Sequence, residues 1–64
     1  MRILFPDGHE EEIPARGRTI EAVLLGIGMN PAELLISRGE TIIPEDTIGI
    51  DEDTIHLIRI SHGG

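Results

Sequence analysis

Apolar residues along the chain follow two spacings, one typical of a helix and one typical of strands. Between residues 20 and 27, four apolar residues recur at i, i+3, i+4 and i+7, which places them on one face of an amphipathic helix. These four are Ile20, Val23, Leu24 and Ile27. Thr19 is a suitable N-cap for this helix, and Gly28 with the following Pro31 predicts its end.

Short β-prone runs separated by turn residues predict the strands, which are residues 2–5, 9–14, 34–37, 40–43 and 54–61. The second run is polar and contains Pro14, which cannot donate to a ladder, so we expect it at a sheet edge. The last run is the most apolar and is expected at the centre. Gly39 is predicted as the second central residue of a two-residue hairpin loop.

The order of these elements predicts the topology. The first and last strands are both apolar, and the intervening helix can supply the crossover that a parallel pair requires. We therefore expect a two-layer α+β domain with a mixed four- to five-stranded sheet and one helix across one face, which is a β-grasp arrangement. Residues 1–64 are expected to form this single domain, with a flexible tail at 61–64. The sequence does not determine which side chains between residues 34 and 38 point toward the helix and which point away from it.

Composition excludes several classes of function. The 64 residues carry a net charge of −7 without a basic cluster, which argues against a nucleic-acid or anionic-membrane surface. The chain has no Cys, so it offers no disulfide, thiolate metal site or Cys nucleophile. The apolar run at residues 23–29 is far shorter than the roughly 20 residues of a membrane span, and no signal peptide is recognisable. We expect a cytoplasmic protein.

Side chains that could perform catalysis are missing from the pattern. We find no nucleophile–base pair or phosphate-binding loop, and His9, His56 and His62 lack metal-ligand spacing. We therefore expect that this protein is not an enzyme and that it binds neither a metal ion nor a cofactor. The last strand runs directly into Gly63 and Gly64. Because Gly has no Cβ, such a tail can enter a narrow channel and deliver a carboxylate to the active site of another protein.

The tail, the helix and residues 30–47 resemble the ThiS/MoaD group of ubiquitin-like sulfur carriers, most closely its short ThiS-like members and the small archaeal modifier proteins. In that group a strand, a Gly-containing turn, a "Val-Pro" return and an acidic turn precede a strand that ends in Gly-Gly. The corresponding positions here are residues 34–37, Gly39, Ile43-Pro44, residues 51–53 and residues 54–64. The resemblance covers essentially the whole chain, and its sharp motif is Gly63-Gly64.

The resemblance implies a mechanism and partners. A ubiquitin-activating-type enzyme would use ATP to adenylate the Gly64 carboxylate, and sulfur transfer would then give a C-terminal thiocarboxylate. A synthase would accept this sulfur for thiamine, molybdopterin or tRNA thiolation. In the modifier members the activated carboxylate is joined instead to a target lysine. A third possibility is a β-grasp interaction module whose tail is never activated.

A docking surface is expected on the sheet face opposite the helix, because exposed apolar patches on small domains mark partner sites. We expect Ile58 there, together with Leu4 or Ile36, and we add Ile60, Arg59 and His62 as candidate partner contacts. The free protein is expected to be a monomer.

Overall fold

Five short strands form one sheet in the computed structural model, which describes residues 1–60. In chain order the elements are β1 (Arg2–Leu4), β2 (Glu10–Glu12), α1 (Ile20–Gly26), the 3-10 helix η1 (Pro31–Glu33), β3 (Leu34–Arg38), β4 (Thr41–Ile43) and β5 (Thr54–Arg59). The five strands and α1 appear in the predicted order, whereas η1 was not predicted. β3 extends one residue further than expected, and the other strands are shorter than expected.

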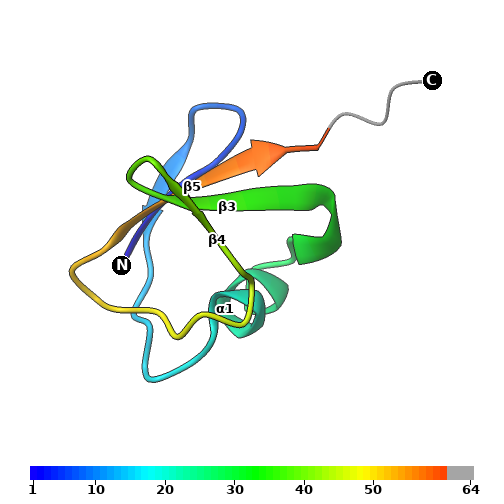
Figure 1. Cartoon of the computed structure of the whole chain (residues 1–64). Coiled ribbons are helices and arrows are strands. Elements are labelled where there is room, and N and C mark those ends of the chain that lie inside the picture. Colours follow the sequence, from blue (N-terminus) through cyan, green and yellow to red (C-terminus); the bar gives the residue numbers. More distant parts are fainter. Residues whose placement is uncertain (61–64) are drawn as a thin grey trace.

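The strand order is β2-β1-β5-β3-β4, with β5 in the middle. β1 and β5 run parallel, whereas the other neighbouring pairs are antiparallel. Figure 1 shows α1 on one side of this mixed sheet. The predictions of a central parallel pair, an edge position for the polar second strand and an α+β architecture are therefore confirmed.

The hydrophobic core lies between α1 and one face of the sheet. Its buried apolar residues are Met1, Ile3, Ala15, Ile20, Val23, Leu24, Leu34, Ile36, Ile55 and Leu57. Three of the four residues predicted on the inner helix face belong to this cluster, and the fourth, Ile27, is half-buried against it. Ile3 and Ile55, which are paired across the central parallel strands, are fully buried.

Both ends of α1 have the predicted caps. The Thr19 hydroxyl accepts a hydrogen bond of 3.1 Å from the Ala22 N–H. Gly28 adopts a φ of +84°, and the next N–H, that of Met29, donates to the Leu24 carbonyl at 2.9 Å, as in a Schellman motif. In the described part of the chain, no helix combines the length and apolar character needed to cross a membrane.

The hairpin between β3 and β4 differs from the prediction. Arg38 pairs with Thr41, so the two-residue loop is Gly39-Glu40 and Gly39 occupies its first central position, with a φ of +61°. The loop starts one residue later than expected because Arg38 remains in β3. There it pairs with Ile55 of β5, and its Nε lies 2.6 Å from the Asp53 carboxylate.

The loop between β4 and β5 holds the N-terminus of the helix. The first two helical N–H groups, those of Ile20 and Glu21, donate to the Thr47 and Glu45 carbonyls at 2.8 and 2.9 Å. Otherwise these N–H groups would lack partners within the helix. The contact also brings the acidic side chains of Glu21 and Glu45 together. A hydrogen bond with the Glu21 side chain raises the pKa of Glu45 from its ordinary value. Partial desolvation and the negative charges of Glu21 and Asp46 raise this pKa further.

We predict that the Glu21–Glu45 contact makes folding stability depend on pH. The folded state raises the Glu45 pKa, so the protonated Glu45 side chain stabilises the fold. This contribution to the free energy of unfolding is fully present below the ordinary pKa of 4.5 and is lost as the pH rises through the raised pKa. Relative to Glu45→Gln, the wild type should therefore be most stable in acid and lose this advantage toward neutral pH. Urea unfolding followed by circular dichroism over this range measures the difference.

Glu40→Gln controls for the loss of one exposed carboxylate elsewhere, since Glu40 lies in the β3–β4 turn. An identical pH slope for Glu45→Gln and Glu40→Gln, each relative to the wild type, would contradict the prediction.

Candidate functional site

The register of the strands determines which side chains face away from α1. Residues directly opposite one another across a sheet lie on the same face. One such row crosses all five strands and consists of Glu10, Leu4, His56, Ser37 and Ile42. Because the core residues Ile55 and Leu57 alternate with His56 along β5, this row lies on the open face of the sheet.

Four aliphatic residues form an apolar surface on this open face, which we call the open-face patch: Leu4, Leu35, Ile42 and Ile58. Leu35 and Ile58 are directly opposite each other on β3 and β5. Their side chains are 42% and 46% exposed, and Ile42 on β4 is 54% exposed, whereas Leu4 is half-buried. These are large aliphatic side chains that folding leaves in contact with water.

Two polar residues lie between the members of the patch. His56 is exposed and is flanked by Leu4 on β1 and Ser37 on β3. Ser37 is buried, and its hydroxyl donates a hydrogen bond of 2.6 Å to the Gly39 carbonyl. The Ser37 hydroxyl therefore has a partner within the β3–β4 hairpin, which leaves His56 as the exposed polar group at the centre of this surface.

The predicted docking residues divide between the two faces of the sheet. Leu4 and Ile58 do lie on the open face, as expected. Ile36 does not: it is 3% exposed and belongs to the core, because β3 directs Leu34 and Ile36 toward α1. The prediction of Ile36 as a member of the docking surface is therefore wrong. Leu35, the residue between them, takes that position.

The other predicted contacts lie near the end of β5. Arg59 pairs with Leu34, so it shares the α1 side of the sheet rather than the open face. Ile60 is half-buried, and its N–H donates to the Glu33 carbonyl at 3.0 Å. His62, Gly63 and Gly64 lie outside the described residues.

Sequence reasoning missed Leu35 and Ile42 as members of the patch. The run from Leu34 to Ile36 is continuously apolar, so its alternation could not be read without the register. Ile42 stands across the hairpin from Ser37, and the Gly39-Glu40 loop sets that pairing. This loop starts one residue later than the sequence predicts, so the sequence does not provide that pairing.

Carboxylates border the patch along β2. Glu10 and Glu12 share the open face with Arg2, whose Nε lies 3.9 Å from the Glu10 carboxylate. Glu12 also pairs with the Met1 amino group at 3.0 Å. The Arg2–Glu10 pair is exposed and contributes little to stability, but the acidic border favours a partner that carries positive charge beside an apolar surface.

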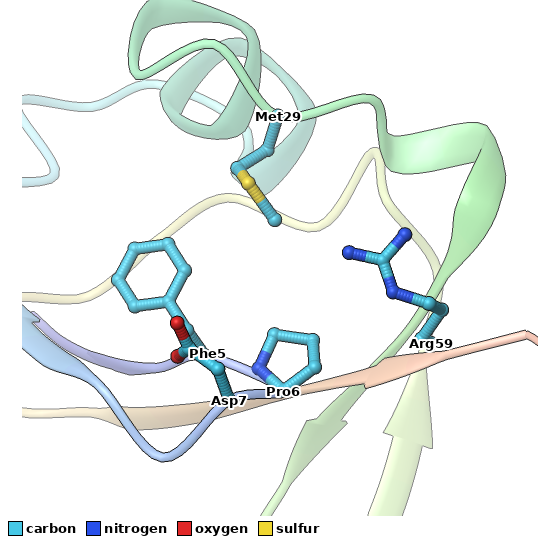
Figure 2. Close-up of a pocket in the computed structure, with 5 residues that line it drawn as sticks. All are labelled: Phe5, Pro6, Asp7, Met29 and Arg59. Carbon is cyan, nitrogen blue, oxygen red and sulfur yellow. The ribbon is translucent and has the colours of Figure 1, made fainter.

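Apart from the open-face patch, a hollow lies where the central parallel strands end. It has a volume of about 320 Å³ and is lined by Phe5, Pro6, Asp7, Met29 and Arg59. Figure 2 shows the Arg59 side chain reaching toward it from β5, while Met29 enters from the segment after α1. The walls are mainly apolar, with one guanidinium and one carboxylate among them. Within residues 1–60, no three His, Asp or Glu side chains form a group suited to a metal ion.

Neither the known protein families nor the curated proteins include a match to this chain.

We predict that two isoleucines on β5 differ sharply in their effect on stability. Ile55→Ala should cost about 2–5 kcal/mol, because Ile55 is fully buried in the core. Ile58→Ala should cost less than about 1 kcal/mol, because the Ile58 side chain is half in water. Chemical unfolding must be followed by circular dichroism, since the chain has no Trp or Tyr.

If Ile55→Ala does not fold, Ile55→Val provides the comparison, with an expected cost of about 0.5–1.5 kcal/mol. Equal costs for matched substitutions at positions 55 and 58 would contradict the assignment of the two faces.

Proposed function

We propose that this chain is a ubiquitin-like sulfur carrier of the ThiS/MoaD type with a β-grasp fold. The observation that carries the proposal is the position of β5. This strand is central in the sheet, supplies Ile58 to the open-face patch and leads directly to the Gly63-Gly64 sequence. One strand thus connects an exposed apolar surface to the carboxylate that a partner enzyme would activate.

The topology supports a β-grasp assignment. A hairpin of β1 and β2, a helix across one face and a last strand parallel to β1 are the features expected of this fold. In this proposal the sheet acts as a rigid support. It keeps the end of β5 at a constant position relative to the open-face patch, so a partner that docks on the patch lies at a fixed distance from the point where the tail begins.

The chemistry proposed for the tail takes place at the Gly64 carboxylate. A carboxylate oxygen attacks the α-phosphate of ATP, and pyrophosphate leaves, which gives an acyl-adenylate on the partner enzyme. Hydrosulfide then attacks the acyl carbon, AMP leaves with one of the former carboxylate oxygens and the S–H proton is lost, so one oxygen of the carboxylate is replaced by sulfur. Because the chain has no Cys, it offers no side-chain thiol to carry the sulfur. Gly63, without a Cβ, lets the tail pass through a narrow channel.

Docking of the activating enzyme is assigned to the open-face patch. Burial of Leu35, Ile42 and Ile58 against the partner would remove their exposed area from water. The acidic border along β2 and the net charge of −7 favour a basic partner surface and fast association. Arg59 and His62 remain proposed contacts beside the tail. The use of ATP is consistent with a cytoplasmic setting.

We predict that removal of Gly64 abolishes thiocarboxylate formation without changing the fold, because the acceptor carboxylate is displaced by one residue. Mass spectrometry of the protein purified from its host measures the product, as the mass increase of one oxygen replaced by one sulfur. Circular dichroism of the truncated protein checks the fold. Covalent attachment to target lysines, with no sulfur product, would identify a protein modifier instead. Full function without Gly64 would identify an interaction module whose tail is not activated.

We also predict that Ile58→Ala weakens binding to the activating enzyme by about tenfold or more, as for a central interface residue. Ile48→Ala is the matched control, because Ile48 is 53% exposed but lies in the loop after β4. Calorimetric titration of the host adenylating enzyme measures both affinities. Equal affinities for the two variants would contradict docking on the open-face patch without bearing on the chemistry of the tail.

A further inference from the structure

The two edges of the sheet differ in charge. The β2 edge carries three consecutive carboxylates, Glu10 to Glu12, and Pro14 follows shortly after. Charged side chains and Pro are the devices by which proteins prevent an exposed edge from pairing with another strand. The β4 edge has the neutral β-branched sequence Thr41-Ile42-Ile43, without a charge inside the strand. The two edges therefore differ in where their charges lie: on β2 the carboxylates are inside the strand, whereas on β4 Glu40 precedes the strand and Pro44 and Glu45 follow it.

Backbone geometry leaves one pairing position inside β4. Arg38 and Thr41 close the two-residue hairpin, and the closing pair of such a hairpin exchanges its hydrogen bonds. Because hydrogen-bonding direction alternates along a strand, the N–H and C=O of Ile42 point away from β3. They face outward on the free side of β4, since β4 is the last strand in the sheet order.

Side chains around β4 indicate what such a position would accept. The Ile42 side chain lies on the open face and continues the apolar surface formed by Leu35 and Ile58. Acidic residues stand just outside both ends of the strand, with Glu40 before it and Glu45 and Asp46 after it, and all three are exposed. The edge therefore has a neutral, apolar centre between two negatively charged ends.

We infer that the β4 edge is a strand-addition site for an extended segment of a partner protein, with β-branched apolar residues at its centre and Lys or Arg at its ends. The segment would pair with the outward N–H and C=O of Ile42 and place an apolar side chain beside that of Ile42. Its basic ends would lie near Glu40 and Glu45. This mode of binding uses main-chain hydrogen bonds for affinity and side chains for selection.

A second copy of this chain fits the same edge less well. Two β4 strands paired around Ile42 would bring the acidic ends of one copy against those of the other, and each chain has a net charge of −7. Charge complementarity therefore favours a basic partner segment. The inference involves residues 40–46 and does not require that the terminal carboxylate is activated.

The test is a titration of the full-length, ¹⁵N-labelled protein with the peptide acetyl-Lys-Arg-Thr-Val-Thr-Val-Lys-Arg-amide. We expect amide chemical-shift changes centred on Thr41 to Ile43 and slower hydrogen exchange at the Ile42 amide. A peptide with Glu in place of every Lys and Arg should not bind. Shift changes centred on Glu10 to Glu12 would overturn the inference, because they would show binding by charge alone. Shifts at Ile42 that depend on protein concentration without peptide would overturn it in favour of self-association.

Ile42→Pro removes the outward N–H and should weaken peptide binding by about tenfold, the loss expected for one hydrogen bond. Pro is tolerated at edge strands where the N–H faces solvent, so the fold should persist. Ile42→Val, which retains this N–H, should bind as the wild type does. If Ile42→Pro does not fold, the hydrogen-exchange result for the wild-type Ile42 amide decides. Unchanged affinity in a folded Ile42→Pro variant, or unchanged exchange at Ile42 with bound peptide, would overturn the inference.

Discussion

The parallel pairing of β1 with β5 is the interaction on which the rest of this structure depends. Strands that pair in parallel cannot be joined by a tight turn, so the chain between them must cross one face of the sheet. That crossover contains α1, and it buries Ile3 and Ile55 completely at the centre of the pair. With these strands in the middle, β2 and the β3–β4 hairpin are left as the flanks. The helix then covers one face, and the other face remains open.

The same strands contribute side chains to both the core and the open-face patch. Their register therefore decides which residues stabilise the fold and which are available for the proposed docking. Along β5, Ile55 and Leu57 face the helix while His56 and Ile58 face solvent. A slip of one residue would exchange these sets and move the patch into the core. A long-range ion pair opposes such a slip on β3, because Arg38 contacts the Asp53 carboxylate directly before β5 begins. The ion pair therefore helps to define the patch, although neither residue belongs to it.

Local signals predicted much of this fold, and the errors lie where local signals are absent. The helix and its caps follow from spacing and from Thr19 and Gly28, and these were confirmed. The direction of Leu35 was not readable, because a continuous apolar run contains no alternation; its pairing with β5 decides it. The hollow near Arg59 was missed for a related reason: Met29 and the β1–β2 turn meet there only in three dimensions. The apolar character of the first and last strands predicted their pairing, whereas the side-chain contacts around this hollow have no such signature in the sequence.

Exposed aliphatic residues are a considerable cost in a domain of this size. A chain near 60 residues buries only about 60% of the surface that it exposes when unfolded, so each large side chain matters to its stability. Full burial of one such side chain contributes about 1.5–3 kcal/mol, yet Leu35, Ile42 and Ile58 keep roughly half of their surface in water. Isolated exposed aliphatics are ordinary, but three clustered on one face are not explained by folding. Their clustering beside β5 and on β4 is the feature that the proposed docking of a partner would account for, because docking would bury these side chains after folding.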